Sequence, residues 1–300
     1  MNFILIAIIG YFFLAVEAVF SKYLLTGKIK SWQVYLFYVG ILSLFSLVFV
    51  PFGLKWWGWE IFLLSILSGL IFFLSLAFLF QSLKDSSVSR VYILYGTIIT
   101  TTTFFLMNFF FMEKFTAKGT LGIIFLLIGG FFISFKFYKH RFFHNYKKII
   151  LAGILAGISL VILKYIYENS NFVSGYVYSR LGIFVGALVF VAIPFFRKEI
   201  FRKNVIKRKK KKNIIYFFGV ITAKIIAGTG VILVSYSIFI GSVTLVNALI
   251  SVQYLLTFLL ATILAIFFKE AIRERLTLSN IILKLVGIFF IAGGVVLISV

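Results

Sequence analysis

The chain has no cysteine, only two prolines and few charged residues. The lack of cysteine excludes disulfides, thiol catalysis and iron-sulfur ligation. Charged residues make up 13% of the 300 positions, and only 8 of them are acidic, whereas soluble proteins carry about 25% charge. Hydrophobic residues make up 62%, against roughly 45–50% in soluble domains. This excess must be solvated by lipid, which predicts a polytopic membrane protein.

Long apolar runs separated by clusters of charge predict ten spanning helices. At about 20 residues per helix, ten spans leave only short loops and no separate soluble domain. No alternation over about ten residues recurs, so a β-barrel is not expected and the fold class should be all-α. The first run has no basic segment before it, so we interpret it as a retained helix and not a signal peptide. The expected spans are residues 2–21, 31–52, 61–81, 91–112, 119–138, 149–168, 174–196, 214–239, 244–268 and 278–300.

The distribution of basic residues predicts an orientation. The odd-numbered loops carry 23 lysines and arginines and the even-numbered loops carry 3. Because basic loops stay in the cytoplasm, this count places both termini outside the cell. We expect a multi-pass protein of the plasma (cell) membrane.

The densest basic segment is the loop at residues 197–212, which ends in the run KNVIKRKKKK. In a soluble protein a formal charge of +22 would suggest nucleic acid, but the positive-inside bias accounts for most of it here. Juxtamembrane basic clusters attract anionic lipid at about 1 kcal/mol per residue. We therefore expect anionic lipid, and no nucleic acid, as the partner of this loop.

The two halves of the chain contain similar residues at matching positions, which indicates an internal repeat. Lys22–Tyr23 recurs as Lys164–Tyr165, 142 positions later, and Gly40 recurs as Gly182 at the same spacing. The only prolines, Pro51 and Pro194, close corresponding spans. Five spans per repeat is an odd number, so the second half should enter the membrane inverted. We expect repeats at residues 1–145 and 146–300, the second containing loop 197–212.

On these features the chain resembles the EamA-like members of the drug/metabolite transporter superfamily, which have ten helices in two five-helix halves. A lysine near the end of the first helix of each half is matched by Lys22 and Lys164, and an arginine in the next helix by Arg180. In the first half Tyr38 replaces that arginine, and the usual proline of the fourth helix is replaced by Ile98 and Tyr254. The resemblance implies transport of a small metabolite and cytoplasmic termini, opposite to the charge count.

Ionisable residues inside spans are functional candidates, because a lysine at a helix centre costs about 2.5–3.5 kcal/mol. Lys224 lies beside a ridge of small residues and could project into a cavity, form an ion pair or extend to the interface. Glu17 could couple protons or pair with Lys22 or Lys224. Lys164 could pair with Glu168 one turn away, near Arg180.

The fourth and ninth spans are the most polar. Asn247, Ser251 and Tyr254 share a helical face at spacings i, i+4 and i+7, whereas Tyr95 lies on a face of span four. These faces could line a substrate path or form interhelical hydrogen bonds, and the threonines could bond back to their own helix. The candidate substrate-path residues are Glu17, Lys22, Tyr95, Lys164, Arg180, Lys224, Asn247, Ser251, Gln253 and Tyr254.

Inverted repeats suit alternating access around a site near the midplane, so we expect a secondary transporter, coupled to protons or to exchange. No Walker A spacing occurs, and no cofactor is expected. An intramembrane enzyme is not favoured, because His140 and His144 lack a third metal ligand. The alternative is a non-transporting membrane scaffold or a lipid-handling protein that uses the basic loop.

Overall fold

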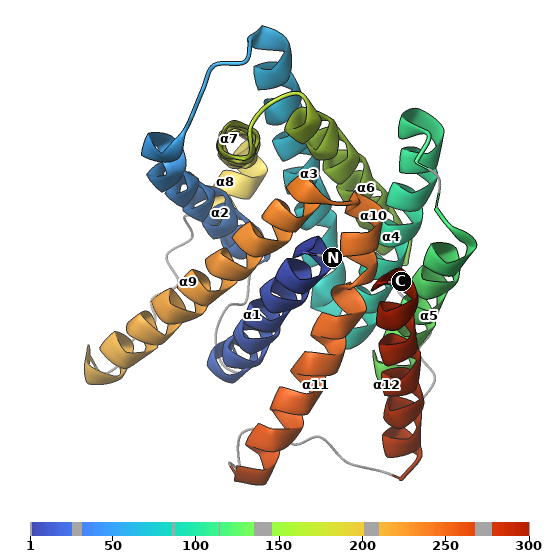
Figure 1. Ribbon diagram of the computed structural model, residues 1–300. Coiled ribbons are helices and arrows are strands. Elements are labelled where there is room, and N and C mark those ends of the chain that lie inside the picture. Colours follow the sequence, from blue (N-terminus) through green and yellow to red (C-terminus); the bar gives the residue numbers. More distant parts are fainter. Residues whose placement is uncertain are drawn as a thin grey trace. The chain divides into compact units, whose positions relative to one another are not determined.

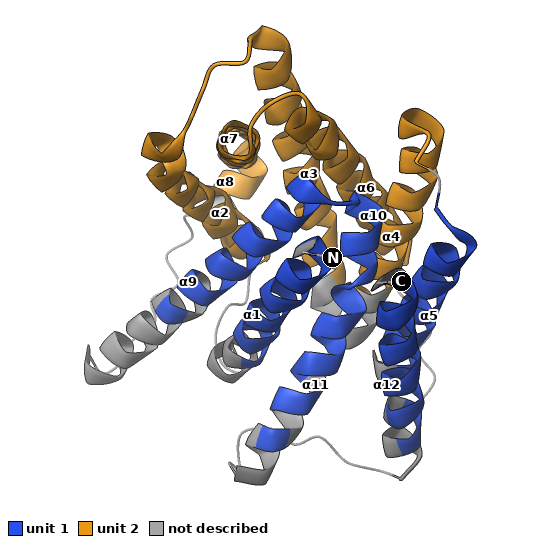
Figure 2. Ribbon diagram, in the orientation of Figure 1, with its two compact units in different colours: residues 1–28, 114–140, 205–300 blue, residues 29–113, 141–204 orange. Residues whose placement is uncertain are grey.

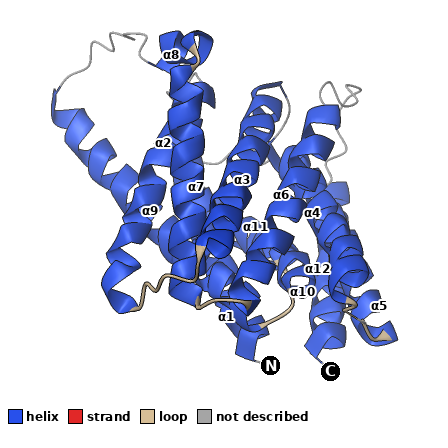
Figure 3. Ribbon diagram, turned by 90° about the horizontal axis from the view of Figure 1, so that it is seen from above, coloured by secondary structure: helices blue, strands red, loops and turns tan. Residues whose placement is uncertain are grey.

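The computed structural model describes residues 2–25, 32–85, 88–113, 115–134, 146–200, 210–267 and 278–299 (Figure 1). These residues form helices and short connections, and none of them lies in a strand (Figure 3). The helices are α1 (Asn2–Leu25), α2 (Trp32–Leu42), the 3₁₀-helix η1 (Ser43–Phe52), α3 (Trp59–Asp85), α4 (Val88–Phe111), α5 (Ala117–Ser134), α6 (Tyr146–Glu168), α7 (Phe172–Ala192), α8 (Pro194–Ile200), α9 (Lys210–Ile240), α10 (Val243–Ala248), α11 (Ile250–Phe267) and α12 (Leu278–Ser299). The predicted all-α class is confirmed.

Several of these helices are long and apolar enough to cross a membrane. Five described segments meet that standard, and they are 32–52, 59–82, 94–111, 146–168 and 172–192. Five shorter apolar helical segments lie at 3–19, 117–132, 225–240, 243–257 and 285–297. The multi-pass helical character is therefore confirmed, whereas the number of ten spans stays a prediction.

The chain forms two compact units, and each takes helices from both halves of the sequence (Figure 2). Unit 1 contains residues 1–28, 114–140 and 205–300, and unit 2 contains residues 29–113 and 141–204. The repeat boundary expected at residues 145 and 146 concerns the sequence pattern and stays a prediction.

In unit 2, α6 packs against α3 and α4. Serine hydroxyls reach across this packing to backbone oxygens, with Ser75 Oγ donating to the Ala152 carbonyl at 2.7 Å and Ser159 Oγ donating to the Ser68 carbonyl at 2.9 Å. Such bonds and small residues replace the hydrophobic driving force that lipid removes. The serines thus hold α3 and α6 at close range.

In unit 1, α1 packs against α9 and against α10 and α11. Ser237 Oγ of α9 donates to the Phe3 carbonyl of α1 at 3.0 Å. Seven residues away on each helix, a Cβ on Gly230 would lie 2.9 Å from the Gly10 carbonyl oxygen. Glycine is therefore required there, because the two backbones approach too closely for a side chain.

The pair α5 and α12 makes reciprocal contacts. A Cβ on Gly129 would lie 2.8 Å from the Gly287 carbonyl oxygen and 2.7 Å from Ile291. A Cβ on Gly294 would lie 2.9 Å from the Gly122 carbonyl oxygen and 2.8 Å from Leu126. The partners Gly122, Leu126 and Gly129 correspond to Gly287, Ile291 and Gly294 at a constant spacing of 165 positions. The two helices therefore present equivalent positions to each other.

The start of α7 fastens the connection between η1 and α3. Asn171 caps α7 by accepting from the Ser174 amide at 2.8 Å, and its Nδ2 donates to the Gly53 carbonyl at 2.6 Å. Ser174 Oγ accepts from the Lys55 amide and donates to the Lys55 carbonyl, both at 2.9 Å. Gly53 has a φ of 121°, which favours glycine. These bonds set the position of η1 along α7.

Candidate functional site

Tyr95 is buried where α4 faces α3 and α6, all within unit 2. Its hydroxyl lies 3.1 Å from Ser75 Oγ, and Ser75 donates in turn to the Ala152 carbonyl. Only 6% of Tyr95 is exposed. The structure therefore shows the interhelical hydrogen bonding that the sequence left open as an alternative, while a lining role for Tyr95 stays a prediction.

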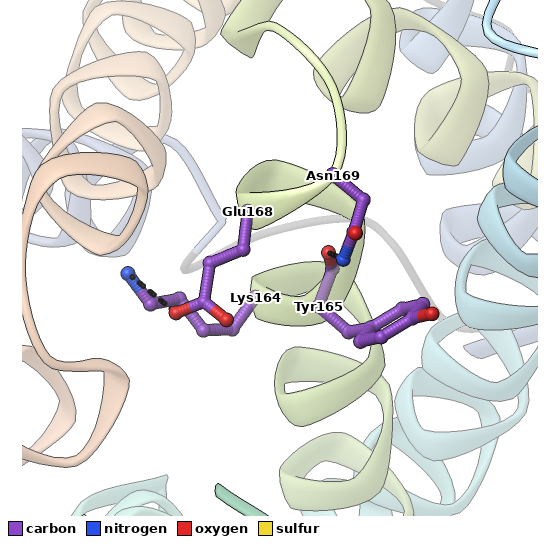
Figure 4. A network of polar contacts seen from close by, with 4 residues as sticks. All are labelled: Lys164, Tyr165, Glu168 and Asn169. Atoms are coloured by element: carbon purple, nitrogen blue, oxygen red, sulfur yellow. Dashed lines mark hydrogen bonds and ion pairs between the residues drawn. The ribbon is translucent and has the colours of Figure 1, made fainter.

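Lys164 and Glu168 form the expected ion pair on the last turn of α6 (Figure 4). Lys164 Nζ lies 3.5 Å from Glu168 Oε1, and the Lys164 side chain is 11% exposed against 44% for Glu168. Because the carboxylate is half in solvent, it compensates a buried ammonium only partly. Asn169, the next residue, donates to the Tyr165 carbonyl at 2.9 Å and stays outside this pair.

Arg180 lies on α7, eight residues after the helix begins. Its guanidinium carbon sits 4.8 Å from the centre of the Tyr176 ring, one turn earlier. Its Nε is buried and has no hydrogen-bond partner among the described residues. The backbone carbonyl of Arg180 accepts from Ser43 Oγ of η1 at 2.9 Å. Within the described part of the chain, this residue therefore keeps an unused donor inside a candidate span.

The helix of the ninth predicted span is interrupted at one residue, Leu249, whose backbone stays in the α region. α10 ends at Ala248 and α11 begins at Ile250. The Val246 carbonyl, in the last turn of α10, accepts from the Tyr11 hydroxyl of α1 at 2.9 Å. Carbonyls of a last helical turn lack an intrahelical partner, so Tyr11 satisfies a group that lipid could not.

The break divides the residues that were expected to share one face. Asn247 lies on α10, whereas Ser251 and Tyr254 lie on α11. Asn247 is 8% exposed, and its Nδ2 is buried without a partner among the described residues, as is Oγ1 of Thr244 one turn earlier. Ser251 Oγ instead donates to the Leu126 carbonyl of α5 at 2.6 Å, an interhelical bond. Asn247 is therefore the residue of this group whose side chain has a buried donor with no partner among the described residues.

Glu17 lies on α1 and is partly buried. The Phe3 carbonyl of α1 accepts a hydrogen bond from Ser237 of α9, and Gly10 of α1 packs against Gly230 of α9. This antiparallel register, continued by one more heptad, predicts that the backbone of Glu17 lies level with residue 223 of α9. The side chains of Lys22 and Lys224 lie outside the described residues, so their expected roles stay predictions.

The positions of the remaining candidate residues neither support nor exclude the roles expected from the sequence. Gln253 and Tyr254 are partly buried on α11. Thr100 and Thr101 donate to the carbonyls of Gly96 and Thr97, so these threonines bond back to their own helix. His140 and His144 lie outside the described residues, as does most of the basic loop. Among the residues that are described, no group of three potential metal ligands occurs.

Several contacts involve residues that the sequence analysis did not single out, namely Tyr11, Ser43, Ser75 and Tyr176. The buried hydroxyls of Ser46 and Thr244, which have no partner among the described residues, were not singled out either. The sequence contained one pattern that could have predicted such interhelical contacts. Ser68, Ser75 and Ser82 recur every seven residues on α3, which places them on one helical face. Polar residues at heptad spacing in an apolar helix indicate a packed interface.

Comparisons with known proteins bear on the fold alone. No family model matches the chain, and no curated protein matches it. A solved structure described as "Crystal structure of protein" resembles it with a TM-score of 0.67 and 14% identity. The match covers 100% of this chain and 99% of that one, so the two share a fold over their full lengths.

Proposed function

We propose that this chain is a secondary transporter, EamA-like within the drug/metabolite transporter superfamily, that moves a small metabolite by alternating access. The packing of the first helix of each predicted repeat carries the proposal. α1 packs against α9, α10 and α11, and α6 packs against α3 and α4. In each case the first helix of one predicted half contacts the third and fourth spans of the other. The same packing thus occurs twice, with the roles of the two halves exchanged. This supports an inverted repeat in which the two halves can exchange conformations.

Two further observations support the proposal. The reciprocal glycine contacts of α5 and α12 are those expected of repeat partners related by a two-fold axis. A one-residue interruption separates α10 from α11, and Asn247 beside it has a buried Nδ2 with no partner among the described residues, which suits a polar ligand site within a membrane helix. A membrane scaffold has no need of either feature.

The test is metabolite-induced stabilisation of the purified protein, followed by flux of each hit into proteoliposomes. A ligand at 100 times its Kd stabilises the bound state by about 2.7 kcal/mol. We expect a hit to stabilise the wild type and the Lys118→Ala control, in which an exposed lysine of α5 is replaced. Lys224→Ala should lose both stabilisation and flux while staying folded. The absence of any hit and of any flux would favour the scaffold alternative.

A further inference from the structure

The most unusual polar group among the described side chains of unit 2 is the guanidinium of Arg180. It has no ion-pair partner in the described part of the chain, and its Nε is buried without a hydrogen bond there. Contact with the Tyr176 ring at 4.8 Å orients the guanidinium but supplies no counter-charge. A cation held inside a candidate span in this way requires a negative partner, which the described residues do not supply.

A second unused donor lies on η1, which packs against α7. Ser46 of η1 is 6% exposed, and its Oγ is buried with no partner among the described residues. A 3₁₀-helix has three residues per turn, so Ser43, Ser46 and Phe49 share one face of η1. Ser43 bonds the Arg180 carbonyl, and the Phe49 ring contacts the Tyr176 ring at 6.0 Å.

The position of Ser46 between Ser43 and Phe49 places it on the face of η1 that meets the stretch of α7 from Tyr176 to Arg180. Both of its neighbours on that face touch α7, so Ser46 faces α7 as well. Long side chains on a helix point back toward its N-terminus, and the guanidinium of Arg180 accordingly lies over Tyr176. The two orphan donors, Nε of Arg180 and Oγ of Ser46, therefore converge on one region between η1 and α7.

We propose that Arg180 and Ser46 bind a carboxylate group of the transported molecule, so that the substrate is a small organic anion. This inference rests on the proposed function, because it names the chemical class of the substrate. An arginine edge and a hydroxyl supply N–H and O–H donors that suit a planar carboxylate. Glu168 already pairs with Lys164, and Arg180 is the one charged residue of α7, so its positive charge suits one carboxylate.

Variants of both donors separate binding from folding. The thermal midpoint is measured with acetate, lactate and glutamate at constant ionic strength, with chloride and the corresponding amides as controls. We expect a carboxylate to raise the wild-type midpoint, and Arg180→Gln or Ser46→Ala to weaken its apparent Kd at least tenfold. Without ligand, both variants should melt at or above the wild-type midpoint, because each removes a buried polar group that has no partner among the described residues.

The matched control is Ser65→Ala. Ser65 is fully buried on α3, but its hydroxyl donates to the Ile61 carbonyl within its own helix. Carboxylate binding should be unchanged in this variant. A purely structural role for Arg180 would instead lower the ligand-free midpoint of Arg180→Gln and leave the carboxylate Kd unchanged, which would overturn the proposal.

Other outcomes are equally decisive. Stabilisation by inorganic phosphate or by phosphatidylglycerol micelles, but not by carboxylates, would overturn the carboxylate class. A neutral metabolite that is transported equally by the wild type and Arg180→Gln would overturn this inference and leave the transporter proposal standing. Arginine-dependent carboxylate binding without any flux would support the site and contradict transport.

Discussion

Replacing Gly69 with alanine is expected to destabilise the protein strongly, although it adds a single methyl group. A Cβ at this position would overlap the Ser179 carbonyl oxygen and lie 2.7 Å from the Gly182 Cα, both on α7. The obstacle is backbone, which cannot rotate away, so α3 and α7 would have to separate. Overpacking of this kind costs about 2–3 kcal/mol, which corresponds to a fall of about 5–10 °C in the thermal midpoint.

The control for Gly69→Ala is Gly228→Ala. Gly228 lies on α9, and a Cβ there would meet nothing within 4 Å. Because alanine favours a helix over glycine by about 1 kcal/mol, this variant should match or slightly exceed the wild-type midpoint. Thermal unfolding of the two variants in the same detergent provides the comparison. Equal midpoints would mean that α3 and α7 are not in close contact.

Gly129→Ala and Gly294→Ala are expected to lower the thermal midpoint by similar amounts. Each added Cβ would meet a carbonyl oxygen and a branched aliphatic side chain at 2.7–2.9 Å, in corresponding positions of α5 and α12. We expect losses of about 1–3 kcal/mol for each. Because both substitutions act on one pair of facing helices, their combined effect should differ from the sum of the single effects.

Gly293→Ala provides the matched control one position away on α12. A Cβ there would meet only the edge of the Phe125 ring at 3.3 Å, which a small rotation of that ring relieves. This variant should stay within about 0.5 kcal/mol of the wild type. A large loss at Gly129 with none at Gly294, or the reverse, would contradict the reciprocal packing of the two helices.

The helical fold could be predicted because its signal is composition and length. Runs of about 20 apolar residues are long enough to span a bilayer, and charge clusters mark their ends. The expected segment 149–168 corresponds closely to α6, and 278–300 to α12. The interruption at Leu249 could not be predicted, because no glycine or proline marks it. The Tyr11 hydroxyl, which comes from a distant part of the chain, donates a hydrogen bond to the buried Val246 carbonyl beside it.

The candidate site was predictable in its ionisable residues and less so in its hydrogen-bond partners. Lys164 and Glu168 are four residues apart, so helix geometry alone predicts their pairing. Ser46 carries no such signal, because its importance depends on η1 being a 3₁₀-helix that faces α7. The roles of Lys22 and Lys224 stay predictions, since their side chains lie outside the described residues.

The absence of cysteine makes alternating access directly measurable with single introduced thiols. Asn247→Cys places one thiol beside the break in the ninth predicted span. The controls are Ser65→Cys, which is fully buried, and Trp57→Cys, which is 43% exposed on the connection before α3. A membrane-impermeant thiol reagent is applied to right-side-out and to inside-out vesicles.

Alternating access predicts that residue 247 is labelled from each face of the membrane in turn. The same account expects Trp57→Cys to react from one face only and Ser65→Cys from neither. A transported metabolite should change the ratio of the two labelling rates at residue 247, because it shifts the population of the two conformations. Labelling of residue 247 from one face only, or from neither face under any condition, would contradict the account.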